Sequence, residues 1–237
     1  NTRTQIREQF DFATILYNKG LYKQSLKILD KAKNLAIEKE ENTLAYELVE
    51  LEKVIESQYI TRSMTDRADI LAVEAKNISL KNVVVSKLSN LSLQLYSWFL
   101  KYGYVRDNHD FKVVNNYYDA QLPVYAFSDL GFTGKMFLYQ AKLWYGFITQ
   151  DFLACYRYSQ KLVALFDEYA DMKQLHPVFY LKAVNYSLES LFYLQQTYRF
   201  NETLIALEDS IEYQRFFVNE NTQVLSNLYL YQHKINL

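Results

Sequence analysis

"LYNKGLYKQSLKILDKA", residues 16–32, contains two stretches of helical periodicity separated by a single glycine. Before the glycine, apolar residues recur at spacings of three and four from Ile6 to Tyr17, as they do along one face of an amphipathic helix. Gly20 interrupts this pattern at a point where a residue able to adopt a positive φ commonly ends a helix. The stretch therefore predicts two antiparallel helices joined by a tight turn at Gly20.

The stretch after the glycine has a helical face of its own, which runs from Tyr22 to Ala36. The small residues Ser25 and Ala32 lie on this face and would let the two helices approach each other closely. Lys33 interrupts the face, and we expect its ammonium group to extend into solvent.

Two further copies of this two-helix unit follow later in the chain. The first has a helical pattern over 137–148, a turn at 149–151 and a second helix that begins at Phe152. The second has a helical pattern over 181–194 and a turn at 196–199. A recurring unit of this kind indicates a repeat architecture. Aligned on the aromatic residue that begins each second helix, the equivalent positions are Tyr22, Phe152 and Phe200, followed three residues later by Ser25, Cys155 and Thr203.

Less regular helical patterns occupy the rest of the chain. Residues 44–60 and 68–78 form one candidate pair, and 84–102 and 111–118 form another. A last helix is predicted over 224–235. Helix pairs along most of the chain predict an all-α solenoid of antiparallel helix pairs.

The composition agrees with this fold class and limits the function. Half of the 237 residues are hydrophobic, and only 5 Gly and 2 Pro occur, which favours long helices over the many tight turns of a β-sandwich. The net charge of -1 argues against a broad basic surface and so against nucleic acid as a partner. The single Cys155 excludes an intramolecular disulfide and suits a cytoplasmic location. No apolar run approaches the ~20 residues of a membrane span.

Residues 123–134 form the longest stretch without helical periodicity and contain one of the two prolines and two of the five glycines. They are either a hinge between two halves or a long loop between repeats. Because repeats flank them on both sides, we expect a single continuous domain over residues 1–237. The chain starts with Asn1 rather than Met and its helical pattern continues to the end, so both ends look truncated.

The residues around Gly20 resemble a tetratricopeptide repeat. The matching positions are a large apolar residue late in the first helix, glycine at the turn, tyrosine two residues later, and then a small residue, a large apolar residue and alanine at helical spacing. In this sequence those positions are Leu16 or Tyr17, Gly20, Tyr22, Ser25, Leu29 and Ala32.

This resemblance implies a right-handed superhelix with elongated repeats, whose concave groove, lined by the first helix of each pair, binds a protein or a peptide. The groove candidates are the residues of the first helices that lie off the buried stripe. They are Thr14, Tyr17, Asn18, Gln140, Trp144, Phe147, Asn185, Phe192 and Gln196.

The sequence contains no recognisable catalytic or metal-binding pattern, so we expect a protein that is not an enzyme and needs no cofactor or metal. His109 lies in "RDNHD" and is either a base oriented by a carboxylate or, as we favour, part of a turn in which Asn108 or Asp110 caps the next helix. The glutamates within 47–56 are expected to form a solvated helix face. Cys155 stands at a small packing position and is expected to be buried.

The chain is unusually rich in aromatic residues, with 22 Tyr and 15 Phe. These side chains either fill wide gaps between long helices or line the groove, and residues 136–147 leave both alternatives open. The favoured function is a non-catalytic scaffold that binds a protein or peptide. The alternative is a sensor or regulatory domain whose effector segment, such as a DNA-binding one, lies outside this chain. The sequence leaves the partner's identity and the oligomeric state open.

Overall fold

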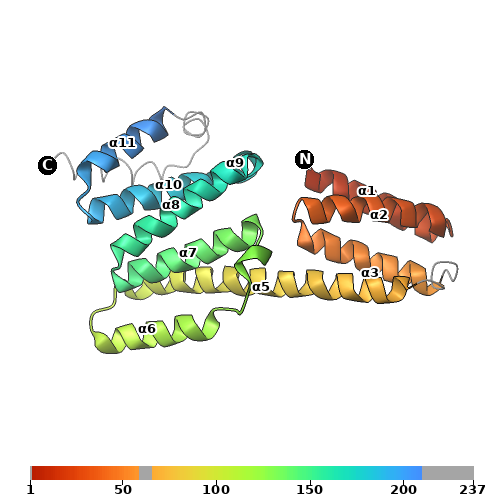
Figure 1. Cartoon of the computed structure of the whole chain (residues 1–237), viewed down its shortest axis with the longest axis horizontal. Coiled ribbons are helices and arrows are strands. Elements are labelled where there is room, and N and C mark those ends of the chain that lie inside the picture. The colour runs from red at the N-terminus through yellow and green to blue at the C-terminus, as the bar shows by residue number, and fades with distance from the viewer. Residues whose placement is uncertain (1, 59–65, 210–237) are drawn as a thin grey trace. The chain divides into compact units, whose positions relative to one another are not determined.

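The computed structural model of the chain describes residues 2–58 and 66–209 (Figure 1). Every regular element within these ranges is a helix, so the predicted all-α fold is confirmed for the described part of the chain. The helix predicted over 224–235 lies outside it. The elements are α1 (Thr2–Asn18), α2 (Tyr22–Glu38), α3 (Asn42–Gln58), α5 (Arg67–Tyr102), α6 (Asn108–Gln121), η1 (Phe127–Asp129, a 3₁₀ helix), α7 (Phe132–Thr149), α8 (Phe152–Glu168), α9 (Ala170–Leu175), α10 (Pro177–Tyr193) and α11 (Thr197–Glu208).

The chain divides into two compact units, Asn1–Ser86 and Lys87–Leu237. The boundary falls within α5, whose first part belongs to the first unit and whose remainder belongs to the second. The segment 123–134, which the sequence leaves as either a hinge or a loop between repeats, lies inside the second unit.

The predicted hairpin at Gly20 is confirmed. Gly20 adopts φ 73°. The N–H of Leu21 donates to the carbonyl of Leu16 at 2.9 Å, and the N–H of Gly20 donates to the carbonyl of Tyr17 at 2.9 Å. This pair of bonds satisfies carbonyls that the end of a helix otherwise leaves without a partner, and the positive φ reverses the chain into α2.

The same helix ending recurs at three other turns, where a residue other than glycine takes the positive φ. Glu40, Gln150 and Gln195 have φ of 57°, 61° and 56°. A non-glycine residue in this conformation costs roughly 1 kcal/mol or more. The turn geometry is therefore kept even where the sequence does not favour it. The corresponding bonds, each spanning five residues, are Glu41 N–H to Ala36 O (2.8 Å), Asp151 N–H to Gly146 O (2.9 Å) and Gln196 N–H to Leu191 O (2.9 Å).

The last of these turns corrects the predicted alignment of the repeats. Helix α11 begins at Thr197, two residues after the positive-φ residue of its turn, as α2 and α8 do after theirs. The turn therefore lies earlier than the predicted 196–199, and Thr197 rather than Phe200 corresponds to the first residue of α2 and α8. Phe200 is fully buried and takes the place that Ser25 and Cys155 hold in the other two hairpins.

Helix α5 is continuous over 36 residues, although the sequence suggests separate helices over 68–78 and 84–102. The residues between these two patterns are more polar but include neither glycine nor proline. Weak apolar periodicity alone does not end a helix, because the backbone hydrogen bonds continue until Gly103, which adopts φ 71°.

Within each unit, helices adjacent in the chain pack against each other. In the first unit α2 packs against both α1 and α3, and the core contains Ile6, Leu29, Leu48 and Leu71 from four different helices. In the second unit α8 packs against both α7 and α10, and α11 packs against α10.

Candidate functional site

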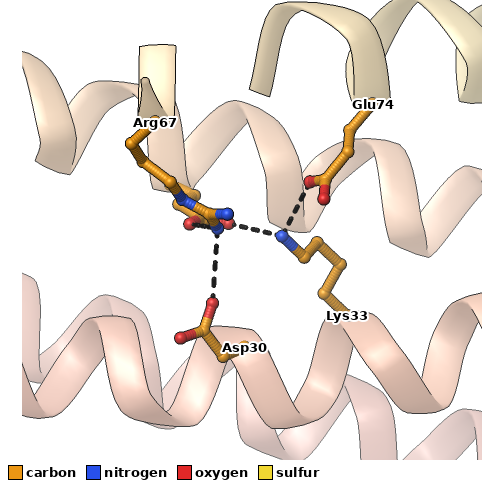
Figure 2. Close-up of polar contacts among 5 residues, drawn as sticks. Asp30, Lys33, Arg67 and Glu74 are labelled. Atoms are coloured by element: carbon orange, nitrogen blue, oxygen red, sulfur yellow. Dashed lines mark hydrogen bonds and ion pairs between the residues drawn. The ribbon is translucent and has the colours of Figure 1, made fainter. Parts of the chain in front are cut away.

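A cluster of charged side chains, with Lys33 and Glu52 buried at its centre, lies where α2, α3 and α5 meet in the first unit (Figure 2). The Lys33 side chain is only 4% exposed, and its ammonium donates to Glu52 Oε2 at 2.9 Å and to Glu74 Oε2 at 2.8 Å. The prediction that Lys33 extends into solvent is therefore wrong. Two carboxylates from neighbouring helices replace the water that its ammonium would otherwise need.

Arg67, at the first position of α5, completes this cluster. Its guanidinium donates to Glu52 Oε1 and, at 3.5 Å, to Asp30 Oδ1. Burial alone would lower the pKa of Arg67, but the bond to Glu52 and the negative charges of Glu52, Glu74 and Asp30 outweigh burial and raise that pKa. The fully buried Glu52 thus accepts bonds from both α2 and α5 and fixes the start of α5 against the other two helices.

A cavity of about 630 Å³ lies beside this cluster, between α3 and the first half of α5. Its α5 side is formed by small and apolar residues, because Ala68, Ala72, Ala75 and Ser79 recur along one face of the helix. Side chains this short leave space that larger residues would fill. The described lining residues are Tyr46, Lys53, Glu56 and Ser57 from α3, and Arg67, Ala68, Leu71, Ala72, Ala75, Lys76 and Ser79 from α5.

The charges that line this cavity within solvent reach are positive. Lys53 on α3 is 38% exposed and bonds Glu50 at 2.7 Å, a surface pair that holds it weakly. Lys76 on α5 is exposed and forms no ion pair with any residue that the structure describes. Both carboxylate oxygens of Glu56 are buried in the wall.

These carboxylates correct a second expectation. The glutamates within 47–56 were expected to form a solvated face, but Glu52 is fully buried and Glu56 is 7% exposed. The signal for this burial is present in the sequence, since Glu52 stands one turn from Leu48 and near Ile55 on the apolar face of α3.

The predicted groove residues of the first unit lie on α1 and outside the cavity lining. Tyr17 is half-buried, and its ring lies tilted at 5.8 Å from that of Tyr22. Its hydroxyl donates to Gln58 Oε1 at 3.3 Å. Asn18 is exposed, and Thr14 is half-buried and donates to a carbonyl of its own helix at 2.9 Å. Tyr17 and Asn18 therefore offer some surface to a partner, and their role in binding stays a prediction.

The predicted anchors of the second unit are core residues. Trp144 is 8% exposed and Phe147 is 1% exposed, and both rings contact Tyr186 of α10. Most of residues 136–147 are buried in the same way, which resolves the open question about this segment in favour of the core. Side chains this covered offer a partner almost no surface in this conformation.

The other candidates of the second unit differ in exposure. Gln140 is half-buried and accepts a bond from Ser92 at 3.5 Å. Asn185 is 5% exposed within α10. Phe192 is half-buried, and Gln196 is exposed in the turn before α11. Of these four, Gln196 presents the most accessible side chain.

The turn around His109 is a helix cap, as favoured, but with a different capping residue. The Asp107 side chain accepts from the N–H of Asp110 at 2.8 Å, whereas Asn108 or Asp110 was expected to do so. His109 is exposed. Arg106 bonds the Asp110 carboxylate at 2.9 Å and lowers its pKa.

Cys155 is buried, as predicted, and its burial raises the pKa of its thiol. Within the described ranges, no three His, Cys, Asp or Glu side chains are grouped to hold a metal ion. None of the helices in those ranges has the length and apolar character needed to cross a membrane.

Comparison with known proteins yields no match to a protein-family model, to a curated protein or to a solved structure. The resemblance to a tetratricopeptide repeat therefore rests on the sequence pattern, chiefly on the residues around Gly20.

Proposed function

We propose that this chain is a non-catalytic module that binds a protein or peptide, built from helix pairs in a tetratricopeptide-like right-handed superhelix. The observation that carries the proposal is the cavity between α3 and α5, which is large enough to receive several side chains of a partner. The proposal moves the binding surface from the predicted first-helix groove to this cavity.

Support for a repeat-like arrangement comes from two hairpins with equivalent contacts. The ring of Tyr17 contacts that of Tyr22 across the α1–α2 turn, and the ring of Phe147 contacts that of Phe152 across the α7–α8 turn. In both hairpins the two rings stand three residues before and two residues after the positive-φ residue. Helix pairs of this kind would stack into a curved array.

Binding at this cavity would draw on apolar burial. An apolar side chain laid against Ala68, Leu71 and Ala72 would lose contact with water, which is worth about 25 cal/mol for each Å² removed. The Glu52–Arg67 bond already holds the start of α5, so this wall needs little ordering when a partner arrives.

The proposal is tested by filling the cavity. Ala72 is exposed and lines open space, so Ala72→Phe should leave the helical circular dichroism and the melting temperature nearly unchanged. A photo-crosslinking residue placed at Ser79 should capture a defined partner in an extract of the native cells, and Ala72→Phe should abolish that product. Ala164→Phe, at an exposed position of α8, is the matched control and should not affect it. Products that Ala72→Phe leaves unchanged would contradict the proposal.

The same cavity supports a second candidate function, the sensing of a small molecule. Its volume of about 630 Å³ falls within the range of sites that enclose drug-sized ligands. A small metabolite that raises the melting temperature of the wild type, but not of Ala72→Phe, would favour this sensor function over protein binding.

A further inference from the structure

The shape of the α3–α5 cavity restricts the conformation of what it holds. The strip from Ala68 to Ser79 covers twelve residues of α5, or about 16 Å from end to end at about 1.5 Å per residue. On the opposite wall, Tyr46 to Ser57 covers the same number of residues of α3. The cavity is thus a groove of about three helical turns between two helices.

The walls favour a helix over an extended peptide. Both are helices whose backbone N–H and C=O groups bond within their own helix, so they offer an extended chain no edge to pair with. An occupant that satisfies its own backbone avoids this cost, and an α-helix does so. The short side chains at Ala68, Ala72 and Ala75 also allow a helix axis to come close to α5.

The accessible charges restrict the occupant's flanks. Lys53 and Lys76 lie on opposite walls, and Lys53 bonds Glu50 in a surface pair at 2.7 Å. Among the described lining residues the carboxylate is that of Glu56, whose two oxygens are buried. A basic flank would meet like charges on both walls, whereas an acidic flank would pair with Lys76 and replace Glu50 in its weak surface pair with Lys53.

We infer that this groove takes an amphipathic helix of another protein, about three turns long, with its apolar face on the Ala68–Ser79 strip and Asp or Glu on its flanks facing Lys53 and Lys76. The inference rests on the proposed binding function and adds the class of partner segment. In this inference Lys53 and Lys76 select partners with acidic flanks, and the small residues of α5 let the partner helix pack closely against it.

The test is a selection from a displayed library of helical peptides of about 15 residues, with an apolar face of Leu and Ala and random residues on the flanks. Wild-type chain should enrich peptides with Asp and Glu on the flanks. The double variant Lys53→Glu and Lys76→Glu should enrich Lys and Arg instead. Lys81→Glu, an exposed lysine of α5 outside the cavity lining, is the matched control and should enrich the same peptides as the wild type.

A synthetic copy of the most enriched peptide then gives the affinity by fluorescence anisotropy. The double variant should weaken its binding by on the order of tenfold, and this difference should shrink as the salt concentration rises. The wild type could instead bind peptides without any preference for acidic flanks, and Ala72→Phe could abolish that binding. This result would contradict the acidic helix and leave the proposed function standing. Enriched peptides that Ala72→Phe does not affect would overturn both.

The remaining alternative is that the groove is occupied by a second copy of this chain. Light scattering of the purified chain measures its mass in solution. A dimer that Ala72→Phe converts to a monomer would show that the groove is filled by the chain itself and would overturn the inference of another protein.

Discussion

The hydroxyl of Ser25 donates a hydrogen bond of 2.7 Å to the main-chain oxygen of Ala13, twelve residues earlier across the α1–α2 hairpin. The thiol of Cys155 stands at the same place in the α7–α8 hairpin, 3.7 Å from the main-chain oxygen of Leu143, again twelve residues earlier. Both donors are fully buried. A small donor at this position therefore lets the paired helices approach closely in both units.

Removing the donor at Ser25 should lower stability. We expect Ser25→Ala to reduce the free energy of unfolding by about 1 kcal/mol, the usual net value of one hydrogen bond. Ser57→Ala is the control, because the Ser57 hydroxyl is exposed and bonds only the Val54 carbonyl of its own helix. That variant should be neutral or slightly stabilising. Urea denaturation followed by circular dichroism measures both, and equal losses would contradict the role given to Ser25.

The α7–α8 hairpin leaves no space for a side chain at Gly146. A Cβ there would stand 2.9 Å from Cys155 Sγ and 3.3 Å from the main-chain oxygen of Asp151. We expect Gly146→Ala to destabilise the chain by about 1–3 kcal/mol through overpacking. The Cys155 sulfur is the atom closest to the new Cβ. Gly146→Ala should therefore lower stability less in a chain that also carries Cys155→Ala than it does in the wild type. A double-mutant cycle measured by thermal melting checks this, and strictly additive losses would contradict it.

Positive φ at the helix-ending turns predicts opposite effects for replacing glycine by alanine and for replacing glutamine by glycine. Gly20→Ala should lower the free energy of unfolding by about 1 kcal/mol through backbone strain. No steric clash adds to this loss, since nothing lies within 4 Å of the new Cβ. Gln195→Gly should raise the free energy of unfolding by up to about 1 kcal/mol, because glycine relieves the same strain. Gln195→Ala keeps the strain and serves as the control, with little change expected. Melting temperatures order the variants, and a destabilising Gln195→Gly would show that the strain is absent.

Features set by neighbouring residues could be predicted from the sequence. Helical periodicity and the turn at Gly20 depend on residues within one or two turns of each other, and both predictions are confirmed. The turn at residues 149–151 was also placed correctly, although Gln150 stands where the pattern favours glycine.

Features set by distant residues could not be predicted. Lys33 is buried because Glu52 and Glu74 reach it from positions 19 and 41 residues away. Trp144 stands on a helix that is apolar on nearly every side, so its periodicity could not distinguish the core from a groove. The cavity depends on a gap between α3 and α5, for which the spacing of Ala68, Ala72 and Ala75 is the only local signal.

Alkaline pH should destabilise the chain through Cys155. Burial raises the pKa of the Cys155 thiol, so the folded state holds this proton more tightly than the unfolded chain does. The resulting stability is complete below the unfolded value of about 8.5 and is lost as the pH rises above it. Burial also raises the pKa of Tyr118, which adds a further loss above about pH 10. Melting temperatures from pH 7 to 10.5 measure this, and Cys155→Ala should flatten the first part of the decline.

The buried cluster around Glu52 should contribute more to stability than any surface ion pair. Glu52→Gln weakens the bonds to both Lys33 and Arg67, and we expect it to cost about 3 kcal/mol, because buried charges then lack a full partner. Asp110→Asn is the control. Its partner Arg106 is 82% exposed, so this loss should stay below about 1 kcal/mol and nearly vanish at about 1 M salt. The effect of Glu52→Gln should persist at that salt concentration.

Since Glu52 also holds Arg67 at the cavity wall, Glu52→Gln should weaken binding of the selected peptide, which Asp110→Asn should not. Equal behaviour of the two variants in denaturation and in fluorescence anisotropy would contradict the role given to the buried cluster.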